Sequence, residues 1–425
     1  MRILIVSTSE ANGGAAVAAH RLMEALNNNG EKVQMLVRDK QSDDISVISL
    51  PQQWRRRWDF LWERFSIFRR LHFHKKNLFG LDVASSGTDI TKLACFRKAD
   101  VIHLHWVNQG MLSLKNIQKI VDSGKPVVWT LHDAWPTTAI CHVTLGCKHF
   151  QSECQLCKYL PDGGSEHDLA WRVWQKKKAL YDKSSIYFVC CSRWLEMEAK
   201  RSGLLRGQRI THIPNPIDTR IYCPGNQATA REALQLPQDK MLLLFVAQRV
   251  TNELKGMSYL EEACKQIVAQ HPELKEKMAL VVLGGSSDEN TIDTGDLEVF
   301  SFDYTYNQQQ IVKIYQAADA FVLPSLSENL PNTIMEAMAC GLPCVGFKVG
   351  GIPEMIDHRK NGYVARYKSA EDLAAGICWT LCEADRDALK QAALRKVHQN
   401  YSQQVVAMDY IEVYNEAMAA KRLRI

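Results

Sequence analysis

Residues 320–347, AFVLPSLSENLPNTIMEAMACGLPCVGF, carry the pattern that decides the fold. AFVLPS indicates a short buried strand, PCVGF indicates a second one, and the segment between them predicts a loop followed by a helix. Short apolar strands that alternate with helices are typical of parallel sheets with helices on both faces. Ligands of such sheets bind outside the carboxyl ends of the strands, so the loop after AFVLPS is a candidate site.

The same alternation runs through most of the chain. MRILIVS, KVQMLVR, VIHLHW, KPVVWTLH and SIYFVCCS indicate buried strands in the first half, and MLLLFVA and MALVVLGG in the second. A chain of 425 residues is long for a single core. Two X-Pro pairs, Ile213–Pro214 and Asn215–Pro216, predict an extended connector between two units. We therefore expect two doubly wound α/β domains, residues 1–217 and 218–400.

Composition limits the classes of function. Hydrophobic residues make up 46% and charged residues 23%, which is typical of a soluble globular protein. A formal net charge of +5 is small for a nucleic-acid binder, so no nucleic-acid partner is expected. The opening MRILIVSTSE reads as a buried strand and not as a signal peptide, and no apolar run approaches the ~20 residues of a membrane span. We expect a cytoplasmic protein whose 13 cysteines are mostly reduced thiols.

Two carboxylates, Glu328 and Glu336, stand out in the 320–347 stretch. Glu328 is expected in the loop at the edge of the sheet, and Glu336 a turn into the helix, where it could accept hydrogen bonds from ribose hydroxyls. The alternative is that both are solvent-exposed charges of a loop and a helix.

The start of that helix is expected to bind an anion. Ser327 or Asn329 could cap it, with Pro331 in its first turn. The backbone amides of Leu330, Asn332 and Thr333 would then point towards a ligand at the positive end of the helix, which suits a diphosphate.

Three more polar turns follow strands of the second half. Arg249 and Lys255 come after one strand and could clamp phosphates. Gly284 and Gly285 come after another, and KVGGIPEM at 348–355 follows a third. Because all of these turns are expected at one edge of a sheet, they predict a nucleotide site.

At this point the sequence resembles the retaining glycosyltransferases of family 4 (group 1), and its cysteine-rich loop resembles their polysaccharide-biosynthesis branch. The resemblance rests on the SENLPNTIMEAMACGLPCVG context, Arg249 with Lys255–Gly256, GGAAVAAHRL, IPNPIDTRIYCP and GGIPEMIDHRKNGYVA. It implies the GT-B fold, with two Rossmann-like domains facing a central cleft and the last helix, 401–425, returning to the first domain. AQRVTNELKG departs from the family, which often has a glycine before the arginine and a shorter spacer.

The resemblance also implies roles for these residues. Glu328 would contact the donor sugar, Glu336 the ribose, and Arg249 and Lys255 the diphosphate. No metal would be required for catalysis, since the cations replace it. Gly14, in the glycine turn after the first strand, would touch acceptor or donor phosphate. The alternative for SEANGGAA is a plain tight turn, and because it lacks the three-glycine fingerprint an oxidoreductase is disfavoured.

A histidine closes another strand of the first half. His132 in VVWTLHDAWP lies at a strand end beside Asp133, where it could hydrogen-bond the donor sugar or handle a proton. A buried structural histidine is the alternative. His103 and His105, which alternate on the strand VIHLHW, carry less weight.

Four cysteines gather within 17 residues in CHVTLGCKHFQSECQLC. Cys141, Cys147, Cys154 and Cys157 have spacings that can surround a tetrahedral structural zinc ion, which would fasten a loop and leave no open position for catalysis. Reduced thiols or two disulfides are the alternatives, and His142 or His149 could replace one thiol.

Residues 54–76, WRRRWDFLWERFSIFRRLHFHKK, predict a helix with an aromatic face flanked by arginines. Such a helix suits an anionic membrane surface. The alternative is a helix whose aromatic face packs on its own domain.

Together these features predict a hexosyltransferase-type enzyme with His132 and Glu328 as candidate catalytic residues. It would move a sugar from a UDP- or GDP-linked donor to a glycan or lipid-linked acceptor at the inner face of the membrane, in capsule, exopolysaccharide or lipopolysaccharide synthesis. A nucleotide-sugar epimerase of the same fold and a non-enzymatic membrane scaffold are the alternatives.

Overall fold

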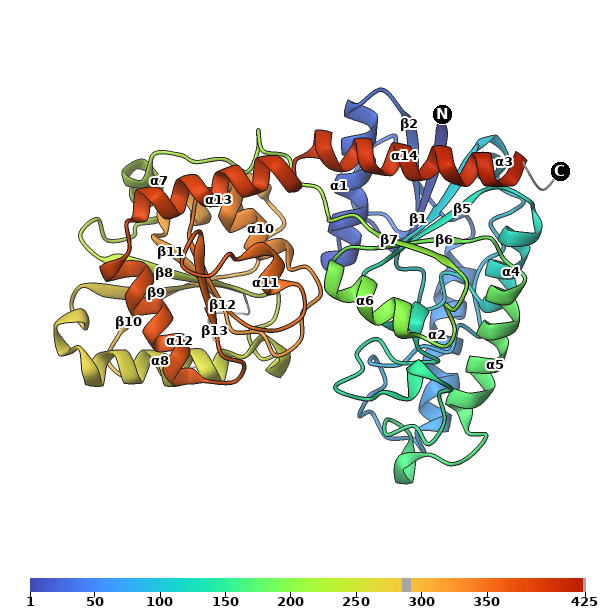
Figure 1. Cartoon of the computed structure of the whole chain (residues 1–425), viewed down its shortest axis with the longest axis horizontal. Helices are drawn as coiled ribbons and strands as arrows, with labels where there is room; N and C mark the ends of the chain where they lie inside the picture. The colour runs from blue at the N-terminus through green and yellow to red at the C-terminus, as the bar shows by residue number, and fades with distance from the viewer. Residues whose placement is uncertain (285–291, 423–425) are drawn as a thin grey trace. The chain divides into compact units, whose positions relative to one another are not determined.

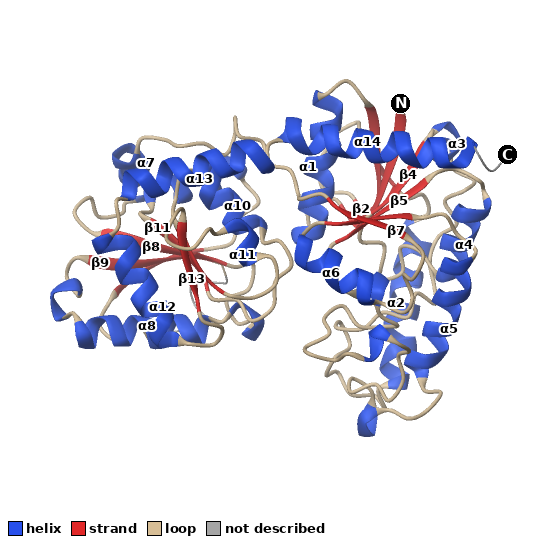
Figure 2. Cartoon of the chain, viewed as in Figure 1, coloured by secondary structure: helices blue, strands red, loops and turns tan. Residues whose placement is uncertain are grey.

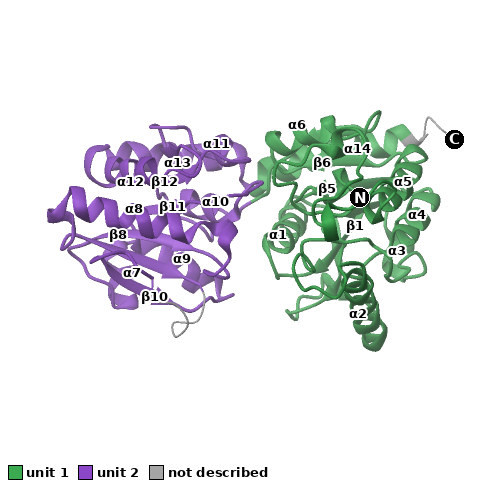
Figure 3. Cartoon of the chain, turned by 90° about the horizontal axis from the view of Figure 1, so that it is seen from below, with its two compact units in different colours: residues 1–216, 403–425 green, residues 217–402 purple. Residues whose placement is uncertain are grey.

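A computed structural model describes residues 1–284 and 292–422, which form two compact units (Figure 3). Unit 1 comprises residues 1–216 and 403–425, and unit 2 comprises residues 217–402. The chain was expected to divide after residue 217 and to return at residue 401. Gly285 and the last three residues of the expected final helix lie outside the described residues.

Unit 1 contains a parallel sheet of seven strands within the described residues, drawn in red in Figure 2. The order of its strands is β3-β2-β1-β4-β5-β6-β7. Its central strands are almost wholly buried, as expected for a sheet with helices on both faces. The strands are β1 (Arg2–Ser9), β2 (Lys32–Asp39), β3 (Val47–Ser49), β4 (Val101–Leu104), β5 (Val127–Leu131), β6 (Tyr187–Cys190) and β7 (Arg209–His212).

The helices of unit 1 pack on both faces of this sheet. They are α1 (Gly14–Asn28), α2 (Gln53–Arg70), α3 (Ala94–Lys98), α4 (Leu114–Asp122), α5 (Leu169–Asp182), α6 (Arg193–Arg201) and α14 (Gln403–Arg422). Short helical turns span Trp135–Thr137, His149–Gln151 and Pro161–Gly163. The chain returns at α14, which lies along unit 1 beside α1 (Figure 1) and buries Tyr410 and Tyr414 in its core.

Unit 2 repeats the architecture with a six-stranded parallel sheet among its described residues, in the order β10-β9-β8-β11-β12-β13. The buried faces of its strands and helices form one hydrophobic core. The strands are β8 (Met241–Val246), β9 (Met278–Leu283), β10 (Glu298–Phe302), β11 (Ala320–Leu323), β12 (Cys344–Phe347) and β13 (Gly362–Ala365).

The helices of unit 2 precede, connect or follow its strands. They are α7 (Gln227–Leu234), α8 (Met257–Gln270), α9 (Gln308–Ala317), α10 (Asn332–Ala339), α11 (Ile352–Met355), α12 (Ala370–Cys378) and α13 (Arg386–Asn400). Short turns span Glu253–Lys255 and Pro272–Leu274, and a π-helical turn spans Trp379–Glu383.

Each sheet has one point at which the order of its strands reverses. In unit 1 it lies between β1 and β4, and in unit 2 between β8 and β11. Loops that leave neighbouring strands in opposite directions open a crevice there, which is where open α/β sheets bind ligands.

Helix α2 packs on unit 1 through its polar face and not through the aromatic face that the sequence offered for packing. Its inward face carries Asp59, Glu63, Arg64 and Ile67. Glu63 accepts hydrogen bonds from the amides of residues 83–85, so a buried carboxyl group fixes this segment from within. Burial, together with the nearby Asp82, raises the pKa of Glu63 to about 8.

The aromatic surface of α2 therefore points to solvent. Its side chains are Trp54, Trp58, Leu61, Trp62 and Phe65, which are 47–72% exposed. For these five residues the alternative of packing on their own domain is wrong, whereas Leu71, on the same predicted face, is buried in the core of unit 1. Among the described residues, no helix has the length and apolar character needed to cross a membrane.

Candidate functional site

The reversal point of unit 2 brings together the loops that follow β8 and β11. Lys255 Nζ lies 2.6 Å from Glu328 Oε1 and forms an ion pair with it. The Lys255 side chain is 32% exposed and that of Glu328 12%, so this pair can be reached from solvent without being fully hydrated. The amide of Leu326 donates to the carbonyl of Leu254 at 2.8 Å and joins the two loops.

Glycines allow the turns at this edge to approach one another. Gly256 has a φ of +73°, and a Cβ there would overlap the carbonyl oxygen of Pro324 at the end of β11. A Cβ on Gly350 would overlap the carbonyl oxygen of Glu328, and one on Gly284 that of Ala247. The four polar turns expected at one edge of the sheet therefore do lie against one another. The turn after β8 contacts those after β9 and β11, and the turn after β12 contacts the one after β11.

Helix α10 starts later than the sequence indicated. Its first residue is Asn332 and its N-cap is Pro331, with no side chain capping it, so the expected cap by Ser327 or Asn329 is wrong. Proline fits this position because the first amides of a helix have no acceptor within the helix. The amides of Asn332 and Thr333 belong to this first turn, and Leu330 lies in the loop just before it.

Glu336 lies in the second turn of α10 and is only 8% exposed. Its Oε2 accepts a hydrogen bond of 2.9 Å from the hydroxyl of Tyr315 on α9, which is fully buried. Neither Glu336 nor Glu328 is the fully exposed charge that the sequence left as an alternative. A buried carboxylate that a tyrosine hydroxyl holds in place is suited to a ligand contact.

Arg249 lies in the loop after β8, and its side chain is exposed. In the described part of the chain it forms no ion pair with a carboxylate. It shares its loop with Lys255, and these two residues are the cations that the β8 loop brings to this edge.

In unit 1, the glycine turn after β1 lies at the other reversal point. Gly13 has a φ of +88° and precedes Gly14, the first residue of α1. A Cβ on Gly13 would meet no atom within 4 Å, so glycine is favoured here by the backbone conformation and not by close packing.

His132 follows β5 at the same edge and is partly buried. Its Nε2 lies 2.9 Å from Nδ1 of His105, and the two rings stack. Burial lowers the pKa of His132 to about 4, although Asp133 opposes that shift. The imidazole is therefore neutral at pH 7.

Three residues near His132, namely Asp133, His105 and His103, make contacts that the sequence did not predict. Asp133 binds Trp106 Nε1 and His142 Nδ1, both at 2.7 Å, and so holds the loop together. His105, which carried less weight in the sequence, is the residue that orients His132. His103 is fully buried and hydrogen-bonds Tyr414 of α14 at 2.8 Å, so it has a structural position.

The four cysteines of the 141–157 loop are free thiols. Cys141 and Cys154 are buried and Cys147 and Cys157 partly so. Burial raises the pKa of Cys141 to about 11 and that of Cys154 to about 12, and the neighbouring thiols add to both shifts. Although the thiols are neighbours, no three His, Cys, Asp or Glu side chains among the described residues are positioned to hold one metal ion.

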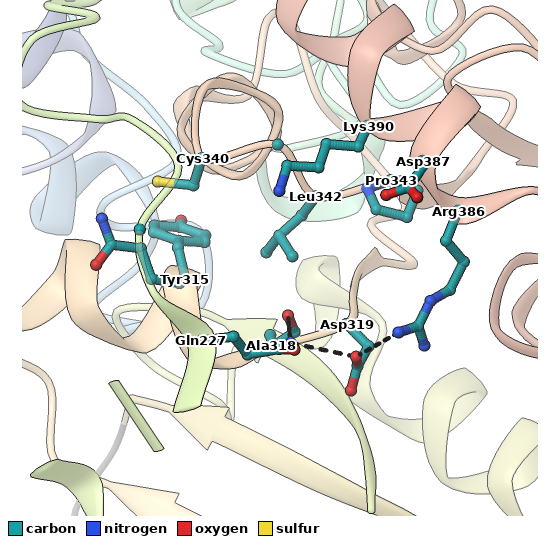
Figure 4. Close-up of a pocket in the computed structure, with 13 residues that line it drawn as sticks. Gln227, Tyr315, Ala318, Asp319, Cys340, Leu342, Pro343, Arg386, Asp387 and Lys390 are labelled. Atoms are coloured by element: carbon teal, nitrogen blue, oxygen red, sulfur yellow. Dashed lines mark hydrogen bonds and ion pairs between the residues drawn. The ribbon is translucent and has the colours of Figure 1, made fainter. Parts of the chain in front are cut away.

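A small pocket of about 180 Å³ in unit 2 is lined in part by Tyr315, the partner of Glu336 (Figure 4). It is lined by residues that precede β11 and β12, such as Asp319 and Pro343, and therefore lies at the amino-terminal edge of the sheet. Asp319 pairs with Arg386 at 3.1 Å and with the buried Arg231 at 2.7 Å. This cluster joins α7 and α13 to the sheet and is structural.

Two family models match the chain. "Glycosyltransferase Family 4" matches residues 12–221, and "Glycosyl transferases group 1" matches residues 226–396. Together they cover both units.

Curated relatives and solved structures agree with these matches. A D-inositol 3-phosphate glycosyltransferase of Saccharomonospora viridis is 29% identical over 48% of this chain and 50% of its own. One from Catenulispora acidiphila is 30% identical over 41% and 42%. The chain thus aligns with about half the length of these curated relatives.

Among solved structures, a sucrose-phosphate synthase from Thermosynechococcus elongatus has a TM-score of 0.67, with 19% identity over 99% of both chains. HepE of Anabaena, in complex with UDP-glucose, has a TM-score of 0.60, with 15% identity over 98% of this chain and 100% of its own. These neighbours share the two-domain GT-B fold, and this chain belongs to the family 4, group 1 glycosyltransferases.

Proposed function

We propose that this protein is a retaining glycosyltransferase that takes a sugar from a nucleotide-diphosphate donor, UDP- or GDP-linked, bound to unit 2. The observation that carries the proposal is the Lys255–Glu328 ion pair at the reversal point between β8 and β11. It pairs a cation for phosphate with a carboxylate for sugar hydroxyls at the place where such sheets bind nucleotides. The UDP-glucose complex of HepE, a protein of the same fold, supports this class of donor.

In this proposal Lys255 changes partner when the donor binds. Without donor, its ammonium is paired with Glu328. An incoming diphosphate carries more charge than a carboxylate and attracts Lys255, which releases the Glu328 oxygens to accept hydrogen bonds from the sugar. Binding of the diphosphate thereby prepares the sugar subsite.

Departure of the diphosphate builds up negative charge that the site must stabilise. Lys255, Arg249 and the first amides of α10, at Asn332 and Thr333, supply fixed positive charge and donors for it. Because these groups neutralise the leaving group, the proposal needs no catalytic metal, and turnover is expected to continue in the presence of EDTA.

The remaining residues position the donor and the acceptor. Glu336, oriented by Tyr315, accepts hydrogen bonds from the ribose. At the carboxyl edge of the unit 1 sheet we propose that neutral His132 hydrogen-bonds a sugar and that Gly14 contacts phosphate. On same-face attack, the acceptor oxygen bonds to the anomeric carbon, the bond to the diphosphate breaks, and the leaving phosphate oxygen takes the acceptor proton.

For the acceptor we propose a glycan or lipid-linked sugar in cell-surface polysaccharide synthesis, such as capsule or exopolysaccharide. The aromatic surface of α2 supports this, because exposed tryptophans among arginines bind anionic membrane surfaces. The enzyme would then work as a peripheral protein on the cytoplasmic face. The names of the curated relatives favour a second acceptor class, an inositol phosphate.

A donor turnover assay with an acceptor panel tests the proposal. Purified protein is given UDP- and GDP-sugars with membrane lipid extract, with inositol phosphate, or with no acceptor, and NMR follows the anomeric configuration of the product. We expect transfer with retained configuration from one donor class, and the productive acceptor identifies the class. An inverted product overturns the retaining assignment, and an altered sugar formed without acceptor identifies an epimerase.

We also propose that zinc binds the 141–157 loop as a structural ion. Thiolates fit zinc chemically, but coordination would require the loop to draw its four sulfurs closer than they stand. Lys177 supports this reading, because its fully buried side-chain nitrogen donates to the carbonyls of Trp135 and Thr138 where the loop begins. Burial lowers the pKa of Lys177 to about 7, while negative charge on Cys141 and Cys154 acts to raise it. Thiolates bound to zinc would therefore favour its charged form, which would offset part of the negative charge of a zinc–tetrathiolate centre.

A further inference from the structure

A groove of about 940 Å³ on unit 1 has no part in the site described above. It runs between the end of α2 and the helices α4 and α5. Figure 1 shows these three helices in the same part of unit 1. Its volume lies in the range of small-molecule sites in proteins, roughly 300–1,000 Å³.

The inside of the groove is apolar. Val83, Leu114, Val173 and Leu180 line it, and each is less than a tenth exposed. They belong to the hydrophobic core of unit 1, so core side chains form the floor of this half-open groove. A hydrocarbon chain would gain burial there in proportion to its apolar area.

The rim of the groove is cationic. Arg70 of α2, Lys115 of α4, and Lys176 and Lys183 of α5 line it and are exposed. Within the described residues none of the four forms an ion pair with a carboxylate. Asp122 is the one lining carboxylate, and it accepts a hydrogen bond from Gln118. Four cations against one carboxylate favour an anionic group above an apolar chain.

The groove continues the aromatic surface of α2. Trp62, Ser66 and Arg70 follow one another at intervals of four, so they lie along one ridge of the helix. Trp62 belongs to the aromatic surface, whereas Ser66 and Arg70 line the groove. The acidic residues of α2, Asp59 and Glu63, are buried, so no carboxylate of this helix faces a membrane.

We propose that the groove binds one acyl chain of an anionic phospholipid, with the phosphate held by Arg70, Lys115, Lys176 and Lys183. This deepens the proposed membrane contact of α2 and rests on it. The aromatic surface lies in the interface of the bilayer, and the groove takes a single lipid from it. A specific lipid beside α2 would fix the rotation of unit 1 on the membrane, which the aromatic surface alone would leave free.

Native mass spectrometry of the full-length protein tests the groove, and vesicle flotation tests the surface separately. Protein is mixed with detergent-solubilised phosphatidylglycerol or phosphatidylcholine, and retained lipid is counted per chain. We expect one retained phosphatidylglycerol, preferred over phosphatidylcholine by at least about tenfold.

Two variants address the two halves of the groove. Lys176→Glu with Lys183→Glu reverses the rim charge, and Ala179→Trp fills the mouth of the groove from an exposed lining position. Both are expected to lose retention at least about tenfold. Lys92→Glu with Lys313→Glu, two exposed lysines outside the groove, makes the same charge change and should retain the lipid.

The outcomes distinguish lipid binding in the groove from the proposed membrane contact of α2 and from the proposed enzyme activity. Ala179→Trp should still float with phosphatidylglycerol vesicles, because the aromatic surface is intact. Equal retention by wild type and groove variants overturns the inference, as does equal retention of the two lipids. Retention of a polyprenyl phosphate but not of phosphatidylglycerol would make the occupant an acceptor lipid and overturn it too. If wild type neither floats nor retains lipid, the membrane contact fails as well, while donor turnover tests the enzyme independently.

Discussion

Gly256→Ala adds a single methyl group and tests most sharply the edge of unit 2 at which we propose that the donor binds. Gly256 follows Lys255, has a φ of +73°, and lies directly against the carbonyl of Pro324 at the end of β11. An alanine there is strained twice, by its backbone conformation and by overlap of its Cβ with that oxygen. The strain can be relieved only by moving the Lys255 loop away from β11.

The two penalties can be separated by a matched control. Gly295, also in unit 2, has the same φ of +73°, but its Cβ would meet Lys265 Cγ at 3.5 Å and Lys265 Cα at 3.8 Å, both ordinary contacts. Gly295→Ala should therefore cost only the left-handed conformation, about 1 kcal/mol. Gly256→Ala adds overpacking of about 1–3 kcal/mol, for a total of about 2–4 kcal/mol in the free energy of unfolding.

Thermal unfolding and nucleotide calorimetry measure the two consequences. For a unit of this size each kcal/mol lowers Tm by about 2–4 °C. In the proposed site Lys255 binds the diphosphate of the donor. A displaced Lys255 would lose this charge-assisted contact, which is worth about 1.5–3 kcal/mol, so nucleotide affinity should fall roughly 10- to 100-fold. If Gly256→Ala matches Gly295→Ala in both Tm and affinity, the Lys255 loop does not lie against β11, and the reasoning is refuted.

Three further predictions follow from other parts of the chain. Asp319→Asn leaves the buried Arg231 without its carboxylate and should cost about 3–5 kcal/mol in urea unfolding; Lys178→Gln, which breaks an exposed pair, should cost less than about 0.5 kcal/mol, and equal losses would contradict the structural role of Asp319. Because the folded pKa of His132 is lowered to about 4, the unfolded chain binds more protons between pH 6.5 and 4, so stability falls as pH drops through this window, by up to about 3 kcal/mol. Urea titrations at several pH values should show this loss, and His132→Ala should reduce it; an unchanged slope would place the proton uptake elsewhere. Protein purified without added metal should contain about one zinc per chain bound by residues 141–157; a content near zero, with all four thiols titrating, would remove that proposal.

The sequence predicted the interior strands of both sheets and missed their edges. β3, β7, β10 and β13 are the outermost strands of the two sheets, and the sequence indicated none of them. Interior strands of parallel sheets are buried on both faces and read as continuous apolar runs. The edge strands are short or partly exposed, as in RITH and EVFSF, and lack that signal.

The candidate site could be placed because most of its residues were tied to the end of a strand or to the start of the helix that follows it. That rule located Lys255 and Glu328 at one edge, where the structure pairs them. That rule could not predict the hydrogen-bond partners of Glu336 and His132. Tyr315 comes from α9 and His105 from β4's end, and contacts between elements distant in sequence depend on packing that periodicity does not encode.

Helix α2 shows the limit of periodicity most clearly. The aromatic spacing predicted a helical face, but not which face is buried. Glu63 and Asp59 decide that, because they hydrogen-bond amides and hydroxyls of residues 83–88 and so draw the polar face inward. The need of those buried backbone groups for partners is invisible in the helix sequence alone.

Calorimetric titration of UDP and GDP into wild type, Lys255→Met and Glu336→Ala tests the central claim most directly. The account predicts that wild type binds one of the two nucleotides and that each variant weakens it at least about tenfold, since each loses a charged contact with the ligand. Circular dichroism of the variants establishes that they remain folded. If wild type binds neither nucleotide, or if both variants bind as tightly as wild type, the edge between β8 and β11 is not the donor site.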